Sequence, residues 1–134
     1  MLICFSPSSS FGDIITKDGV KIQFFKKGQK KSISKDVLNG NSLSLHDSEC
    51  LDKIVFTKTK NNSPVYSLKI FNSNNELILR KSYIFLEKNK GFVLPIYPWI
   101  VETDHYKIEI MEGDNMVLSI EYEIFEDGYT DNEN

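Results

Sequence analysis

Apolar and polar residues alternate along most of this chain with a period of two, the spacing of a β-strand that buries one face. The alternation extends over residues 20–24, 43–45, 65–71, 106–110 and 118–124, and more weakly over 33–37 and 54–59. No window of eleven or more residues has the apolar spacing of an amphipathic helix. The pattern therefore predicts an all-β chain.

A longer apolar segment covers residues 77–86. If it is a strand, one face carries Leu79, Tyr83 and Phe85, and the other face carries Ile78, Ile84 and Leu86.

Clusters of turn-forming residues separate these runs at intervals of roughly 10–20 residues, which is typical of a sandwich or a barrel. They are residues 18–19, 39–41, 61–64, 72–75, 89–91 and 113–115. The length of 134 residues fits one domain. We expect an antiparallel β-sandwich of about eight or nine strands in residues 1–125, followed by an acidic, flexible tail at 126–134.

The last two predicted strands can be placed in register, because directly opposed residues of an antiparallel pair share a face. A three-residue loop at 113–115 satisfies this condition, with Asn115 as the left-handed residue. The predicted pairs are Ile110 with Leu118, Ile108 with Ile120, Tyr106 with Tyr122, Lys107 with Glu121 and His105 with Glu123.

Residues 102–108 resemble the entry to the penultimate strand of many immunoglobulin-like sandwiches. In that architecture an acidic turn precedes a tyrosine, here Tyr106, whose hydroxyl bonds back to the backbone. The resemblance covers about seven residues and supports an immunoglobulin-like general plan. The Cys, Trp and Cys core of antibody domains is absent, since Trp99 comes too late for it.

Composition supports the β-prediction only in part. The chain contains no alanine but fifteen isoleucines, nine phenylalanines and six tyrosines, and β-branched and aromatic residues favour strands. An AT-rich genome would produce the same bias and would also explain fifteen lysines against one arginine. The prediction of strands therefore rests on the alternation.

The hydrophobic fraction of 40% and the charged fraction of 26% are those of a soluble globular domain. No apolar run is long enough for a membrane-spanning helix, and the N-terminus has no cationic segment typical of a secretory signal. We expect a cytoplasmic protein without a membrane partner.

The net charge of −3 is unevenly distributed. Residues 102–134 contain eleven acidic residues and one lysine, whereas Lys26, Lys27, Lys30 and Lys31 form a basic stretch. Nucleic-acid sites normally add arginine and stacking aromatics to such a stretch, so we expect no nucleic-acid partner. Two alternatives remain for these lysines: a solvated turn, or a contact with an acidic partner surface.

Residues 91–101 contain three aromatic side chains, Phe92, Tyr97 and Trp99, next to Pro95 and Pro98. Two prolines spaced in this way exclude a central strand, because each lacks a backbone donor. The segment is therefore an edge or a crossing loop. Trp99 either closes one end of the core or is exposed as part of a binding surface for a protein or a glycan.

Catalytic and metal-binding patterns are weak. The only cluster is His46 to Cys50, where a thiol nucleophile would need His46 close to Cys50. Cys4 is expected in the core, and a Cys4–Cys50 disulfide is disfavoured without a secretory signal. The spacing of zinc ligands is absent. We expect no cofactor and no metal.

Oxygen ligands at the tip of the last predicted hairpin are the remaining metal candidates. Glu112, Asp114 and Asn115 could supply them, but the residues around them do not follow a calcium-loop pattern.

These observations predict a non-catalytic, protein-binding β-sandwich module. It would be an inhibitor or immunity-type protein, or an accessory subunit of an assembly such as a phage or secretion component. Its partner would be another protein or a second copy of the chain, contacted through Phe92, Tyr97, Trp99, Lys26, Lys27, Lys30 and Lys31. Two alternatives stay open: a carbohydrate-binding module that uses Trp99 and Tyr97, and a thiol-dependent enzyme that uses Cys50 and His46.

Overall fold

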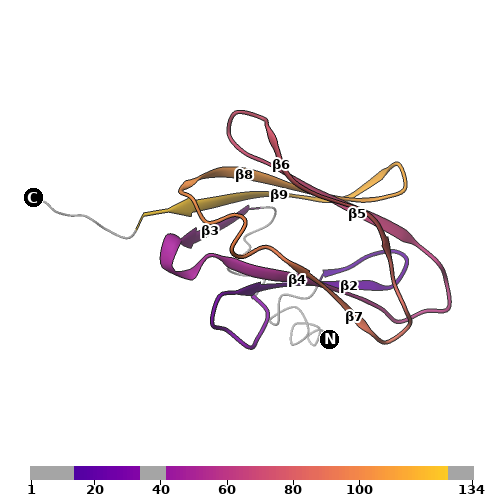
Figure 1. Ribbon diagram of the computed structural model, residues 1–134. Coiled ribbons are helices and arrows are strands. Elements are labelled where there is room, and N and C mark those ends of the chain that lie inside the picture. Colours follow the sequence, from indigo (N-terminus) through magenta and orange to yellow (C-terminus); the bar gives the residue numbers. More distant parts are fainter. Residues whose placement is uncertain (1–13, 34–41, 127–134) are drawn as a thin grey trace, which may run out of the picture.

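The computed structural model describes residues 14–33 and 42–126 (Figure 1). Its strands are β1 (Ile14–Ile15), β2 (Val20–Lys26), β3 (Ser42–His46), β4 (Leu51–Lys58), β5 (Val65–Phe71), β6 (Leu77–Phe85), β7 (Gly91–Pro95), β8 (Asp104–Glu112) and β9 (Asn115–Phe125). A single 3-10 turn, η1 (Asp47–Glu49), joins β3 to β4.

The strands form two stacked sheets, visible as the upper and lower layers of Figure 1. The first sheet has the order β1-β2-β4-β7, and the second has the order β3-β9-β8-β5-β6. The predicted all-β sandwich of nine strands is confirmed. One pair departs from the antiparallel expectation, because β3 lies parallel to β9.

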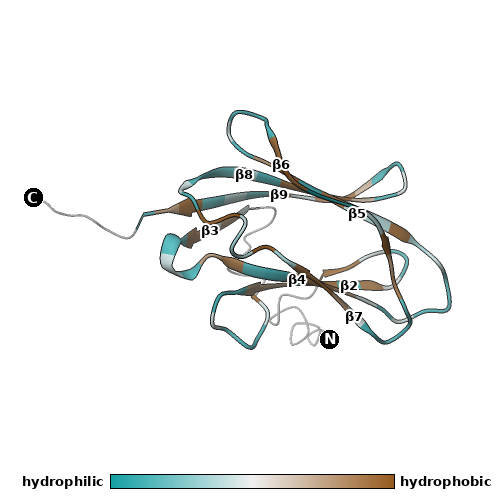
Figure 2. Cartoon of the chain, in the orientation of Figure 1, coloured by the Kyte–Doolittle hydropathy of each residue, from teal (hydrophilic) through white to brown (hydrophobic). Residues whose placement is uncertain are grey.

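The core lies between the sheets and contains the side chains that the alternation placed on one face of each strand. In β2, Val20, Ile22 and Phe24 are buried while the residues between them are not. Tyr66, Tyr122, Phe24 and Phe56 are the largest fully buried side chains. Figure 2 shows that most loops are hydrophilic, whereas hydrophobic and hydrophilic residues are mixed along the strands.

The β8–β9 hairpin has the predicted register, including Tyr106 opposite Tyr122, Ile108 opposite Ile120 and Ile110 opposite Leu118. The predicted loop was wrong in its length and in its left-handed residue. Glu112 pairs with Asn115, which leaves a two-residue turn. Gly113 has the positive φ of 59°, as the first central residue of a type II′ turn requires.

A β-bulge reconciles the shorter turn with the predicted register. The pairing shifts between Ile110 and Met111, so that one extra residue of β9 is accommodated there.

The predicted tyrosine contact before β8 is present. The Tyr106 hydroxyl donates a hydrogen bond of 2.6 Å to the carbonyl oxygen of Glu102. This bond fixes the loop that enters β8, because the tyrosine ring is itself buried against Tyr122 in the core.

Some predictions lie outside the described residues: those for Cys4, for residues 34–41 and for the tail after Glu126. Of the weak run at 33–37, only Ile33 is described, and it is buried outside any strand. Its N–H donates to the carbonyl oxygen of Phe24. Among the described residues, no helix has the length and apolarity needed to cross a bilayer.

Candidate interaction surface

Exposed apolar side chains gather on one side of the sandwich. Among the described residues, six of the eight large exposed hydrophobic side chains lie on β6, on β7 or in the turn after β7. They are Leu77, Ile78, Tyr83, Phe85, Val93 and Trp99, and we call them the open-side surface. The strand order explains this clustering, because β6 and β7 are edge strands of the two stacked sheets.

A groove of about 390 Å³ runs between these two edges. Ile78, Leu79, Arg80 and Lys81 line it from β6, and Leu94, Pro95 and Trp99 line it from the other side. The Lys81 ammonium lies 6.0 Å from the centre of the Phe92 ring, so side chains also meet across the opening. The groove is therefore apolar along its walls and carries two cations at the β6 rim.

Trp99 is the most prominent member of the open-side surface, with 72% of its area exposed. A tight turn holds it there: its N–H donates to the carbonyl oxygen of Ile96, and the Tyr97–Pro98 peptide bond is cis. Ile96 and Ile100 on either side are buried and fill the end of the core. The alternative in which Trp99 closes the core is therefore wrong.

The other two predicted aromatic residues are less accessible. Phe92 is half-buried and packs against the core, because it lies opposite the buried Phe56 in the sheet. Tyr97 is half-buried and is engaged by Lys27, whose ammonium donates to the Tyr97 hydroxyl at 3.1 Å and lies 4.2 Å from the ring centre. This hydrogen bond is the largest cause that raises the pKa of Lys27.

The four predicted lysines do not form one patch. Lys27 meets Tyr97, seventy residues away in the sequence, whereas Lys26 approaches Glu49 at 3.9 Å. Lys30 and Lys31 are exposed in the segment after β2. The structure thus joins Lys27 to the aromatic turn and gives the other three lysines different surroundings.

Sequence reasoning missed the contribution of β6 to this surface. Tyr83 and Phe85 are both exposed, and their rings stack with centres 6.5 Å apart. Tyr83 has a positive φ of 59° beside a shift in the β5–β6 register, so its side chain does not follow simple alternation. The sequence does show apolar residues on both faces of 77–86, and an edge strand cannot bury both faces. The pattern alone, however, does not distinguish an edge strand from a central one.

The chemistry of Cys50 is unlike that of a reactive thiol. The residue is 1% exposed, and desolvation is the largest cause that raises its pKa, whereas a thiol nucleophile needs a lowered pKa. His46 packs its ring against Phe125, with ring centres 4.4 Å apart. Neither environment favours nucleophilic catalysis.

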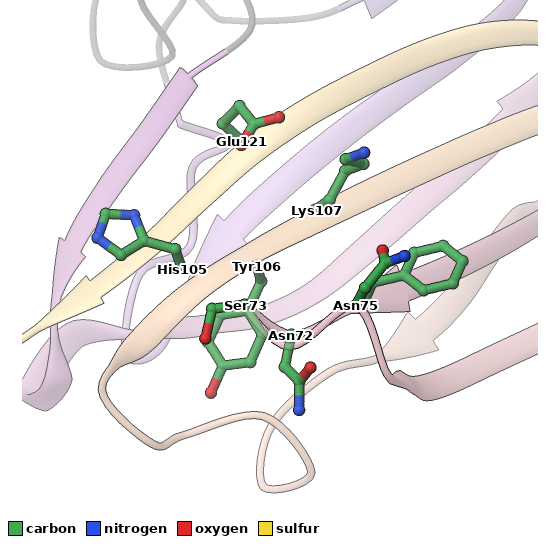
Figure 3. A pocket seen from close by; sticks show the side chains of 8 residues that line it. Asn72, Ser73, Asn75, His105, Tyr106, Lys107 and Glu121 are labelled. Atoms are coloured by element: carbon green, nitrogen blue, oxygen red, sulfur yellow. The ribbon is translucent and has the colours of Figure 1, made fainter.

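A second hollow, of about 370 Å³, lies on the second sheet. Figure 3 shows that its side chains come from the turn after β5, from β8 and from β9. His105 on its rim lies 3.5 Å from Glu123. A hydrogen bond from the Ser73 side chain is the largest cause that lowers the pKa of Asp104, which ties this turn to the start of β8. Several of its lining groups already have partners, among them Asn72 with Glu76 and Tyr106 with Glu102, so it is a weaker candidate than the groove.

The described residues contain no group of three or more His, Cys, Asp or Glu side chains placed to hold a metal ion. At the hairpin tip, Glu112 interacts instead with Asp18. A hydrogen bond between the two side chains is the largest cause that raises the pKa of Glu112, as expected when two carboxyl groups share a site.

The chain matches no protein-family model and no curated protein.

Proposed function

We propose that this protein is a non-catalytic binding module that recognises another protein through its open-side surface. The observation that carries the proposal is the 72% exposure of Trp99 beside an apolar groove between two edge strands. Tryptophan is enriched among residues that dominate binding energy at protein interfaces. Apolar side chains clustered on one side mark interaction sites more often than scattered ones do.

An inhibitor or immunity-type protein, or an accessory subunit of an assembly, fits this proposal best. Both roles need a stable scaffold that presents a surface, and neither needs a reactive group. The environments of Cys50 and His46 support the same conclusion, because neither is set up for nucleophilic chemistry.

We further propose that the sandwich is immunoglobulin-like in its general plan. Two features support this. The Tyr106 hydroxyl bonds to the backbone four residues upstream, at the start of the penultimate strand, as in the tyrosine corner of that fold. In addition, the last two strands, β8 and β9, lie side by side in one sheet, as the last two strands of the immunoglobulin fold do.

A carbohydrate-binding module is the second candidate, because an exposed indole ring can stack on a sugar. Trp99 supports it, but Tyr97 is turned to Lys27 and is only partly accessible. Titration with a panel of oligosaccharides distinguishes the two functions: a shift of Trp99 fluorescence with a sugar would favour glycan binding.

The protein-binding proposal is tested by affinity capture from a lysate of the source organism, using wild type and Trp99→Ala. We expect a protein that the wild type retains and the variant loses. Ile15→Ala is the matched control, because Ile15 is 62% exposed but lies on β1, at the opposite edge of the first sheet.

The proposal is supported if Ile15→Ala still retains the captured protein and Trp99→Ala loses it. Capture of no protein, or equal capture by all three chains, would overturn it. Thermal unfolding should be nearly unchanged in both variants, because surface substitutions rarely change stability by more than about 0.5 kcal/mol.

A further inference from the structure

We propose that the outer edge of β6 binds an extended segment of the partner by adding it as a further strand, and that this segment carries acidic residues among apolar ones. This inference rests on the proposed function and specifies the partner's chemistry. It is carried by the length of the edge, by its apolar side chains and by the charges in its middle.

The second sheet ends at β6, and no strand within the described residues covers its outer side. β6 has nine residues, whereas the other three edge strands, β1, β3 and β7, have two, five and five. An edge strand presents unpaired backbone N–H and C=O groups. A long uncovered edge is therefore the best place in this fold for a partner strand to form main-chain hydrogen bonds.

The side chains along β6 give such a strand apolar contacts. Ile78 and Leu79 line the groove that ends at Trp99. The stacked rings of Tyr83 and Phe85 lie further along the same strand, with Phe85 on the face opposite to the buried Ile84. In strand addition, pockets for alternate side chains provide specificity while the backbone provides affinity. The incoming segment would thus carry apolar residues.

The charges in the middle of β6 specify the charge of the incoming segment. Arg80 and Lys81 are consecutive, so they project to opposite faces of the strand. Arg80 and Lys81 are the only charged residues between Leu77 and Phe85, and both are exposed. Opposite charges placed across neighbouring strands stabilise the pair, and like charges directly opposite destabilise it. An acidic segment is therefore favoured over a neutral or basic one.

The same charges disfavour a second copy of the chain as the occupant. A two-fold pairing centred on β6 would place Lys81 opposite its own symmetry mate, with Arg80 close by. The register shifts of β6 beside Tyr83 and near Leu77 further disturb a regular self-pairing. Cations and bulges of this kind protect edge strands from self-association while leaving a matched partner able to bind.

The experiment uses Trp99 as its reporter, because it is the only tryptophan in the chain. The wild-type protein is titrated with three tryptophan-free nine-residue peptides. One alternates valine with glutamate, the second alternates valine with lysine, and the third is the glutamate peptide with prolines at alternate valines. Fluorescence reports burial of Trp99, and calorimetry reports binding independently of it.

We expect the glutamate peptide to bind and to shift the emission to shorter wavelength. The lysine peptide should bind about tenfold more weakly or worse, because it places like charges, and not opposite ones, near Arg80 or Lys81. The proline peptide should also bind weakly, because proline removes donors that strand addition needs.

A charge-reversed variant tests the assignment of the edge. In Arg80→Glu/Lys81→Glu the preference should invert toward the lysine peptide. Lys30→Glu/Lys31→Glu is the matched control, because it changes the net charge equally at exposed residues after β2. The control should keep the wild-type preference.

Three results would overturn the inference: equal binding of the glutamate and lysine peptides, binding unaffected by proline, or no binding of any peptide. A wild-type dimer in sedimentation that Arg80→Glu/Lys81→Glu dissolves would identify a second copy as the occupant and also overturn it. If affinity capture yields a Trp99-dependent partner while the peptides fail, the proposed function stands and only this inference is lost.

Discussion

Tyr106 combines a buried ring with a hydroxyl that is hydrogen-bonded to the backbone. Its ring is buried against Tyr122, and its hydroxyl donates to the Glu102 carbonyl at 2.6 Å. Desolvation is the largest cause that raises its pKa, to about 12. Tyr106 thus fixes the entry to β8 and, together with the more deeply buried Tyr122, makes the fold sensitive to alkaline pH.

We predict that stability falls as the pH rises above about 10. The folded protein holds the Tyr106 proton more tightly than the unfolded chain, whose tyrosine pKa is the ordinary 10.0. The stabilisation is therefore complete below pH 10 and is lost as the pH rises through about 12. Tyr106→Phe should weaken this dependence without abolishing it, because burial also raises the pKa of Tyr122. It should cost about 1 kcal/mol at neutral pH, where the hydrogen bond is lost.

Urea unfolding of wild type and Tyr106→Phe between neutral and alkaline pH measures both effects. Tyr83→Phe is the control, because the Tyr83 side chain is exposed. An identical pH profile in wild type and Tyr106→Phe would contradict the prediction.

At the scale of elements, the β8–β9 hairpin depends on the conformation of one glycine. Gly113 has a φ of 59°, and no atom lies within 4 Å of the position where a Cβ would be. A side chain would therefore have room, and only its backbone conformation would be strained.

We predict that Gly113→Ala destabilises the protein by about 1–2 kcal/mol, because a side chain at positive φ meets the neighbouring carbonyl oxygen. Asp114→Ala, at the second turn position without a positive φ, should cost much less. Chemical unfolding of both variants gives the comparison, and equal losses would show that the turn conformation is not the cause.

At the scale of the whole molecule, the two sheets close over Cys50 and remain open along β6 and β7. Cys50 is 1% exposed, and its pKa is raised by burial. Access to its thiol therefore requires the sandwich to open.

We predict that Cys50 resists alkylation in the native protein and reacts once the protein unfolds. A Cys4→Ser variant leaves Cys50 as the only thiol, so that mass spectrometry after iodoacetamide treatment reports it alone. The rate should increase with urea in step with global unfolding. Rapid alkylation without denaturant would contradict the burial of Cys50 and would revive the thiol-enzyme alternative.

The candidate site was predictable only in part. Trp99 and Tyr97 were identifiable because prolines and aromatics together exclude a central strand. The role of Phe92 was not, since its half-burial depends on Phe56 in the neighbouring strand. The sequence analysis missed the exposed residues of β6, because the apolar pattern of a segment does not show whether it lies at the centre or at the edge of a sheet. These residues are Leu77, Ile78, Tyr83 and Phe85.

The local pattern by itself determined most of the strands, the buried face of those that alternate, the β8–β9 register and the tyrosine contact at Glu102. These features follow from side chains that are near in sequence or directly opposed in one hairpin, so alternation and turn chemistry are sufficient. Only the tertiary structure decided that β3 runs parallel to β9, that Lys27 meets Tyr97 and that β6 and β7 form one open side. Those outcomes depend on how distant strands share two sheets, and no local pattern encodes which strand is left at an edge.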